Sequence, residues 1–250
     1  MRTIYIFLYS VLLILACGSD EIPTPTETKP NYFPDAIGST WVYRSLDGIQ
    51  WTWSIKEEKT IEDFVYLYIE TSPTLALYHC DYLLPNFLRS SENQILFNIR
   101  DRIDYYIHNK LPEHVKEEFS GLDVKVEINP ISFPELLFLE IPITTNKQSE
   151  IYNIKIDGNF ILQDLVLLKI PFEVHIKINC EVIGERSVDT PVGEFDRAYQ
   201  LEYQIDTINT VFSDEKSTKL KQTIWFVPYV GIVKIEDERG VLELIEYQVQ

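Results

Sequence analysis

Apolar and polar residues alternate with a period of two along most of this chain. The clearest run is 172–182, in which Phe172, Val174, Ile176, Ile178, Cys180 and Val182 alternate with polar residues without an error. A second run at 199–206 places Tyr199, Leu201, Tyr203 and Ile205 on one side. This alternation is typical of strands with one face in a core and the other in water, as in an antiparallel sheet.

Short turn motifs separate these runs. Thr190-Pro191-Val192-Gly193 lies between the two clearest runs and suits a hairpin turn, because proline presets φ and glycine accepts a left-handed conformation. Asp47-Gly48 and Asp157-Gly158 are typical of two-residue hairpins, and Glu238-Arg239-Gly240 of a three-residue loop. The predicted strands are 40–46, 50–57, 64–70, 94–99, 102–107, 124–128, 136–143, 149–156, 159–168, 172–184, 195–206, 219–227, 231–237 and 241–249.

The pattern predicts an all-β fold with a minor α component. One helix is expected from Pro112, which suits a first helical position, to Gly121, which can end it. A sheet of this many strands must curl or split to avoid flat exposed edges. The expected architecture is therefore one large curved antiparallel sheet with a short covering helix, and a β-sandwich is the alternative. Residues 32–250 contain no repeat and no second linker, so we expect a single domain.

The first 16 residues have the composition of a signal peptide. Arg2 provides the positive start, and residues 4–15 form an apolar run that is shorter than the ~20 residues a membrane-spanning helix needs. The four residues Ile14-Leu15-Ala16-Cys17 resemble a bacterial lipobox. The resemblance implies cleavage before Cys17 and acylation of that cysteine, for example with palmitate. The alternatives are an ordinary secretory signal with an incidental cysteine, or an uncleaved anchor.

Residues 17–31 suit a tether between the lipid and a folded body. This segment contains Pro23, Pro25 and Pro30 with threonines and acidic residues, and such a composition cannot bury enough apolar surface to fold. Extended at ~3.1 Å per residue, it spans roughly 40 Å. The lipoprotein resemblance implies a place in the bacterial cell envelope. Gly18 stands where an inner-membrane retention aspartate would be, which favours the outer membrane in a host with two membranes, in the periplasm or at the cell surface.

Charge and composition exclude several classes of function. The formal net charge of -17 would repel nucleic-acid phosphates and anionic lipid headgroups, so we expect no nucleic-acid partner and a membrane contact made by covalent lipid alone. Four scattered histidines provide no metal site. The chain has no nucleophile elbow, phosphate-binding loop or zinc motif. We therefore expect neither enzymatic activity nor a cofactor.

Three segments resemble a broad set of bacterial exported proteins and lipoproteins of unknown function. These segments are Tyr32-Phe33-Pro34 with Gly38, Trp41 and Tyr43; Thr190-Pro191-Val192-Gly193-Glu194-Phe195; and Trp225-Phe226 with Pro228, Val230, Gly231, Val233 and Lys234. The resemblance implies a curved antiparallel β fold akin to the half-barrels of lipoprotein carriers, and it implies no catalytic residues. Alternatively, these residues have structural roles, because proline and glycine end or bend strands and the tryptophans fill the core.

Cys80 and Cys180 are the two cysteines of the expected body. An oxidising compartment would allow a disulfide between them, closing a loop of ~100 residues and stabilising the fold by up to ~4–5 kcal/mol. The alternation places Cys180 on the inner face, which equally suits a buried free thiol.

Two classes of function remain open. The first is a non-enzymatic envelope lipoprotein that holds an apolar ligand, such as a lipid, against a concave sheet. Its pocket would be lined by Phe172, Val174, Ile176, Ile178, Tyr199, Leu201, Tyr203 and Ile205, under the helix at 112–119, unless side chains fill that space. The second is a surface interaction or glycan-binding module that uses exposed aromatic residues. The direction of Trp51 and Trp53 would distinguish them, and the sequence leaves the oligomeric state open.

Overall fold

The computed structural model describes residues 32–250, except 73–85, 92, 119–123, 163–167 and 212–213. The predicted signal peptide, the tether, Cys17 and Cys80 therefore lie outside the described residues. The strands are β1 (Thr40–Ser45), β2 (Gln50–Ile61), β3 (Phe64–Ser72), β4 (Phe87–Ser90), β5 (Gln94–Asn98), β6 (Val124–Ile128), β7 (Leu136–Glu140), β8 (Lys147–Leu162), β9 (Leu168–Thr190), β10 (Gly193–Val211), β11 (Asp214–Val227), β12 (Gly231–Asp237) and β13 (Gly240–Gln248). One helical segment consists of α2 (Arg100–Tyr105), the π-helix η1 (Tyr106–Lys110) and α3 (Leu111–Glu118).

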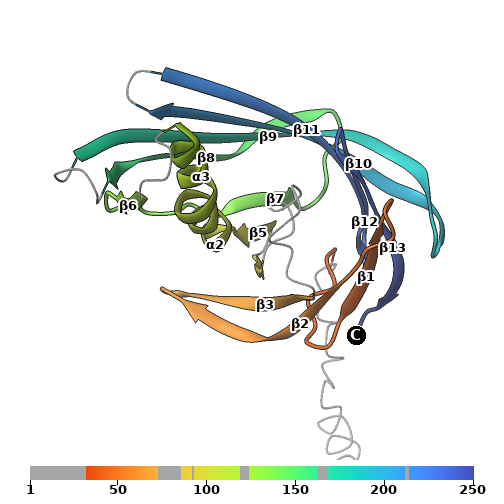
Figure 1. Ribbon diagram of the computed structural model, residues 1–250. Coiled ribbons are helices and arrows are strands. Elements are labelled where there is room, and N and C mark those ends of the chain that lie inside the picture. Colours follow the sequence, from red (N-terminus) through yellow and green to blue (C-terminus); the bar gives the residue numbers. More distant parts are fainter. Residues whose placement is uncertain (1–31, 73–85, 92, 119–123, 163–167, 212–213) are drawn as a thin grey trace, which may run out of the picture. The chain divides into compact units, whose positions relative to one another are not determined.

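The thirteen strands of the described residues form a single open sheet. Its order is β6-β8-β9-β10-β11-β12-β13-β1-β2-β3-β4-β5-β7, and neighbouring strands pair antiparallel. Figure 1 shows the sheet curling, with the helical segment on its concave side between β8–β9 and β2–β3. The prediction of one large curved antiparallel sheet with a short covering helix is confirmed, and the sandwich alternative is not the fold that forms.

The edge strand β7 packs against the middle of the sheet. Phe138 of β7 stacks on Phe97 of β5 with 4.5 Å between ring centroids, and on Tyr203 of β10 at 6.3 Å. The Phe138 ring also meets Phe226 of β11 edge-on at 6.0 Å. The Tyr203 hydroxyl donates to the Phe138 carbonyl oxygen at 3.2 Å. These contacts hold one end of the sheet against its centre and define the curl.

The start of the body is tied to the turn between β11 and β12. The Tyr229 amide donates to the carbonyl oxygen of Tyr32 at 3.0 Å, and the two rings stack. The indole nitrogen of Trp41 donates to the Val230 carbonyl oxygen at 2.6 Å. Phe33 packs against Trp41 with ring centroids 5.9 Å apart. The first and third of the motifs singled out in the sequence therefore meet in space, where they have structural roles.

The prediction of a strand at 102–107 is wrong, because this segment is helical. Its informative spacing is four rather than two, since Ile99, Ile103, Ile107 and Leu111 are all buried. At 100° per residue, a spacing of four drifts about 40° at each step away from one helix face. The wider π turn at Tyr106–Lys110 takes up an extra residue and compensates for this drift. The helix expected from Pro112 thus begins at Arg100.

The predicted hairpin at Asp157-Gly158 is also wrong, because β8 runs straight through it. Gly158 pairs with Phe172 on one side and Ile128 on the other. A Cβ atom at Gly158 would overlap the Glu127 carbonyl oxygen and lie 2.8 Å from the Phe172 ring. The glycine is required for close packing within the sheet and not for a turn.

The remaining turn predictions are closer to the structure. Gly48 has φ 85° and closes the β1–β2 turn, and Thr190 pairs with Gly193 across the predicted β9–β10 turn. The loop predicted with three residues between β12 and β13 is shorter, because Asp237 pairs with Gly240 and leaves two residues. The short strand β4 was not predicted.

We expect Gly158→Ala to lower the free energy of unfolding by about 1–3 kcal/mol, because backbone and ring atoms would have to move for the added methyl group. Urea unfolding measures the change. Lys155→Ala on the same strand is the control, since its ion pair with Glu173 is exposed and contributes about 0–1 kcal/mol. Equal stabilities for the two variants would contradict the packing role.

Candidate functional site

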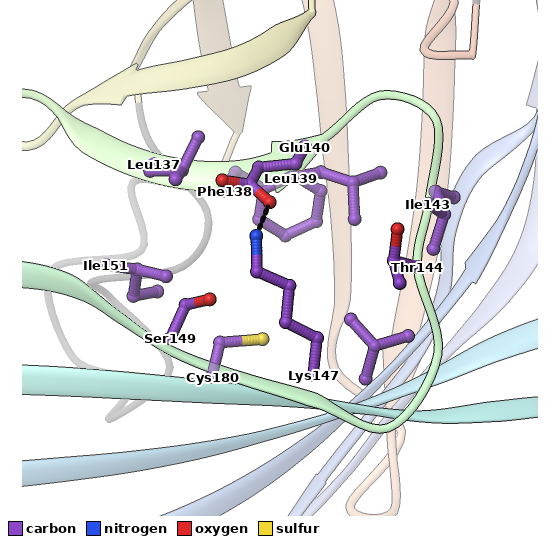
Figure 2. A pocket seen from close by; sticks show the side chains of 11 residues that line it. Leu137, Phe138, Leu139, Glu140, Ile143, Thr144, Lys147, Ser149, Ile151 and Cys180 are labelled. Carbon is purple, nitrogen blue, oxygen red and sulfur yellow. Dashed lines mark hydrogen bonds and ion pairs between the residues drawn. The ribbon is translucent and has the colours of Figure 1, made fainter.

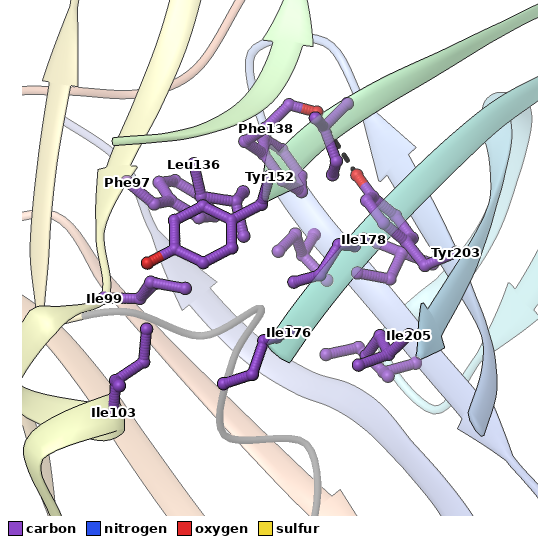
Figure 3. Packing of buried hydrophobic residues seen from close by; sticks show 14 of the residues in the cluster. Phe97, Ile99, Ile103, Leu136, Phe138, Tyr152, Ile176, Ile178, Tyr203 and Ile205 are labelled. Carbon is purple, nitrogen blue, oxygen red and sulfur yellow. Dashed lines mark hydrogen bonds between the residues drawn. The ribbon is translucent and has the colours of Figure 1, made fainter. Parts of the chain in front are cut away.

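The structure brings the predicted pocket residues onto one face of β9 and β10. Ile178 pairs with Ile205 and Cys180 with Tyr203 across the two strands. All eight predicted residues are buried except Tyr199, which is half-buried. Figure 3 shows Ile176, Ile178, Tyr203 and Ile205 facing Ile99, Ile103, Tyr152 and Phe138. The predicted walls are therefore part of a packed core made with the helical segment and β7.

The helical segment is fixed over this face by apolar and polar contacts. Ile103 and Ile107 are completely buried. The Asn209 side-chain amide at the end of β10 donates to the Tyr106 hydroxyl at 3.0 Å. Burial raises the pKa of the Tyr106 hydroxyl. The segment thus covers the concave face as a structural element of the core.

A small cavity lies between β7 and the β8–β9 pair, beside Cys180 (Figure 2). Its volume is ≈ 30 Å³, which is about the volume that one molecule occupies in liquid water. Leu139, Ile143 and Val182 provide apolar lining, and the ion pair of Lys147 with Glu140 lies at its polar side. In this conformation the cavity is too small for an acyl chain.

Cys180 is a buried thiol on the inner face, as the alternation predicts. Its side chain is 6 % exposed, and desolvation by burial raises the pKa of the thiol to about 12. Cys80 lies outside the described residues, so the disulfide stays a prediction.

The tryptophans that distinguish the two function classes point inward. Trp51 is 3 % exposed and Trp53 is 1 % exposed. Trp53 packs against Trp41 with ring centroids 5.6 Å apart and against Phe33 edge-on at 6.2 Å. These rings belong to the core and form no outward-facing aromatic stripe.

A partly buried polar cluster joins β3, β4 and the segment before β7. Glu135 accepts hydrogen bonds at 2.7 Å from the Tyr66 hydroxyl and from Arg89 Nε. The Arg89 guanidinium also lies over the Phe64 ring, 4.4 Å from its centroid. Burial and the neighbouring carboxylate raise the pKa of Tyr66 to about 12. Each group is occupied by another, so we assign the cluster to holding the strands together.

A larger cavity lies on the opposite, outer face of the sheet, where no sequence motif predicts one. We name it the outer-face hollow. It has a volume of ≈ 280 Å³ over β8, β9, β10 and β11. Its outward-facing residues are Gln148, Asn179, Glu181, Glu202, Gln204, Lys221 and Thr223, and the buried residues Cys180, Tyr203 and Gln222 also line it. Residues 75 positions apart, at 148 and 223, meet there only because four strands align in register.

In the described part of the chain, no three histidine, cysteine, aspartate or glutamate side chains are grouped to hold a metal ion. No helix of the described residues has the length and apolar character needed to cross a membrane.

Comparison with known proteins gives similarity to solved structures only. No protein-family model matches this chain, and no curated protein matches it. A candidate lipoprotein from Parabacteroides distasonis is similar, with 15 % sequence identity, a TM-score of 0.44, and coverage of 88 % of this chain and 99 % of that chain. A candidate exported protein with YmcC-like fold from Bacteroides fragilis has 11 % identity, a TM-score of 0.43 and the same coverage. The family resemblance drawn from the three sequence motifs stays a prediction.

We expect the reduced protein to lose stability between pH 9 and pH 12. An unfolded thiol ionises near pH 9, whereas buried Cys180 holds its proton until about pH 12, so its stabilising contribution is complete below pH 9 and falls as the pH rises. By pH 10.5 the loss is about 2 kcal/mol. Urea unfolding with reductant at pH 8 and pH 10.5 measures it. Cys180→Ala should lose less over this interval, and an equal loss in both proteins would contradict the assignment.

Proposed function

We propose that this chain is an exported lipoprotein of the bacterial cell envelope, cleaved before Cys17 and acylated there. The support comes from the order of the segments: a positive start, a short apolar run, a small residue before a cysteine, and a proline-rich tether. The folded body then begins near Tyr32, where the tether is expected to end. In a host with two membranes, Gly18 favours the outer membrane.

Covalent lipid, and not the protein surface, would hold the body at the membrane. The net charge of -17 opposes binding to anionic headgroups and to nucleic acid. Acyl chains contribute about 0.8 kcal/mol for each buried methylene, and two or more chains give stable anchoring. The acidic body would then stay in the aqueous space next to the membrane.

We propose further that the body is a non-enzymatic binding module that works through its outer surface. One observation carries this proposal: the concave face is occupied by the chain's own side chains, from Ile103 of the helical segment to Phe138 of β7. The cavity on that side holds about one water molecule, whereas the hollow on the outer face has a volume of ≈ 280 Å³. A ligand or partner would reach the outer face without any rearrangement of the core.

A second candidate function is the holding of an apolar ligand beneath the helical segment. The observation in its favour is the continuous apolar face of β9 and β10, which the helical segment covers. Binding would require this segment to move away from the apolar face of β9 and β10 and leave Ile176 and Ile178 to the ligand. The energetic cost of exposing those residues makes this the second choice.

We expect Cys17→Ala to abolish incorporation of labelled palmitate into the protein in growing bacteria, because no other residue follows the lipobox pattern. Labelling with gel fluorography measures the outcome, and Cys180→Ala is the matched control that keeps the label. Label retained by the Cys17 variant would contradict the lipoprotein assignment.

We expect native mass spectrometry of the full-length acylated protein to give the mass of the covalently modified chain alone. Bound lipid at one molecule per chain, with a loss of bound mass in Ile178→Ala, would favour the apolar carrier over the surface module. The measurement therefore separates the two candidate functions, because the wild type and Ile178→Ala are both anchored at Cys17.

A further inference from the structure

The outer-face hollow is built from polar side chains on four consecutive strands. Gln148, Glu181, Glu202 and Thr223 lie in one row, because each pairs with the next across β8, β9, β10 and β11. A neighbouring row contains Asn179, Gln204 and Lys221, which are paired in the same way. All seven side chains point away from the core, since they alternate with buried Ile178, Cys180 and Tyr203.

Irregular pairing on either side of these rows accounts for the concave shape. In the β8–β9 pair the register shifts between Glu150 and Tyr152, and in the β9–β10 pair it shifts between Gln200 and Leu201. A β-bulge bends its strand and increases the local twist. Bends at both ends of the rows leave a depression between them, and its floor is the hydrogen-bonded sheet. Such a floor is rigid and pre-organised.

The charges in the hollow differ from those around it on the same face. Nearby, Lys177 pairs with Glu150 and Lys155 with Glu173, with nitrogen–oxygen distances of 2.7 Å in both cases. Within the described ranges, Glu181 and Lys221 form no ion pair. Glu202 accepts a hydrogen bond from the Gln200 side-chain amide at 3.2 Å, which orients its carboxylate. The Gln204 side-chain amide donates to both oxygens of the Asp206 carboxylate at 3.2 Å. Among the described residues, the hollow's remaining hydrogen-bonding capacity therefore lies mainly on Gln148, Asn179, Glu181 and Lys221.

We propose that the outer-face hollow binds a neutral, hydroxyl-rich carbohydrate. Each amide offers a donor and an acceptor, the carboxylates offer acceptors, and Lys221 offers donors. Neighbouring hydroxyl groups of a sugar donate and accept together, so they match this mixture. An anionic ligand would meet Glu181 and Glu202, which lie directly opposite each other on adjacent strands. A compact cation would meet Lys221.

The size of the hollow and one aromatic neighbour agree with this ligand class. A volume of ≈ 280 Å³ lies just below the ~300–1,000 Å³ typical of small-molecule pockets, which suits a short saccharide. Trp225 follows Thr223 on the same face and pairs with Gln200. Its indole nitrogen donates to Glu236 at 3.5 Å, which holds the half-buried ring in place beside the hollow. The ring can offer an apolar surface to a sugar.

This inference rests on the proposed function, because it names a ligand class for the outer surface of the anchored body. The two can fail separately. Palmitate label retained by Cys17→Ala would overturn only the anchor, whereas a labelled, correctly anchored protein that binds no neutral carbohydrate would overturn only the ligand class of the hollow.

The test uses full-length acylated protein in lauryldimethylamine oxide micelles, a detergent without a sugar headgroup. The probe is an array of neutral hexose, N-acetylhexosamine, uronic-acid and phosphorylated oligosaccharides. We expect binding to neutral members of the array. Titration calorimetry with the best neutral oligosaccharide then compares the wild type with Glu202→Gln, which keeps the shape of the side chain, and with Asn179→Ala.

Both variants should weaken binding at least tenfold. Glu215→Gln is the matched control, since Glu215 lies on the same strand as Lys221 and Thr223 but outside the hollow, and it should bind like the wild type. Thermal unfolding checks that each variant folds. If Asn179→Ala does not fold, Glu202→Gln alone decides the outcome. Binding of no neutral sugar, binding of charged sugars alone, or unchanged affinity in Glu202→Gln would overturn the proposal.

Discussion

The packing of Phe138 against the centre of the sheet is the contact on which this fold depends. An open sheet of thirteen strands has an apolar face too large to leave in water, and the residues that the structure describes form no second sheet to cover it. Phe138 brings the edge strand β7 onto Tyr203 and Phe226, so the sheet covers itself. Full burial of such a side chain contributes about 1.5–3 kcal/mol, and each aromatic pair adds about 0.5–1.5 kcal/mol. The helical segment fills what the curled strands leave open.

This way of covering the sheet assigns different roles to its two faces. The side chains of the inner face stabilise the fold, since they pack against one another, the helical segment and β7. The outer face is exposed to water, and several of its charged residues form ion pairs with neighbours on adjacent strands, such as Lys155 with Glu173 and Lys177 with Glu150. Where local bends make that face concave, polar groups without ion-pair partners gather. Binding and folding can therefore be changed separately by substitutions on opposite faces of the same strands.

Residue alternation predicted the strands well because it reports directly on a sheet with one buried face. The run at 172–182 and its partner at 199–206 appear in the structure with the expected inner residues. Alternation failed at 102–107, where Ile103 and Ile107 follow a spacing of four that is visible once Ile99 and Leu111 are included. The turn motif failed at Gly158, because Glu127 and Phe172, which are distant in sequence, leave no space for a side chain there. The outer-face hollow depends on register shifts between strands, and no single segment of sequence encodes these.

The attachment of Tyr32 to the β11–β12 turn has a mechanical consequence. Tension on the chain ahead of Tyr32 reaches the body first at the hydrogen bond from Tyr229 and the stacked rings, and next at the bond from Trp41 to Val230. It then passes into β1, which has hydrogen-bonded partners on both sides, β13 and β2. A central strand resists removal because both of its ladders must rupture together, whereas an edge strand can peel away one bond at a time. The body is built to carry a pulling force on its amino-terminal side without losing a strand.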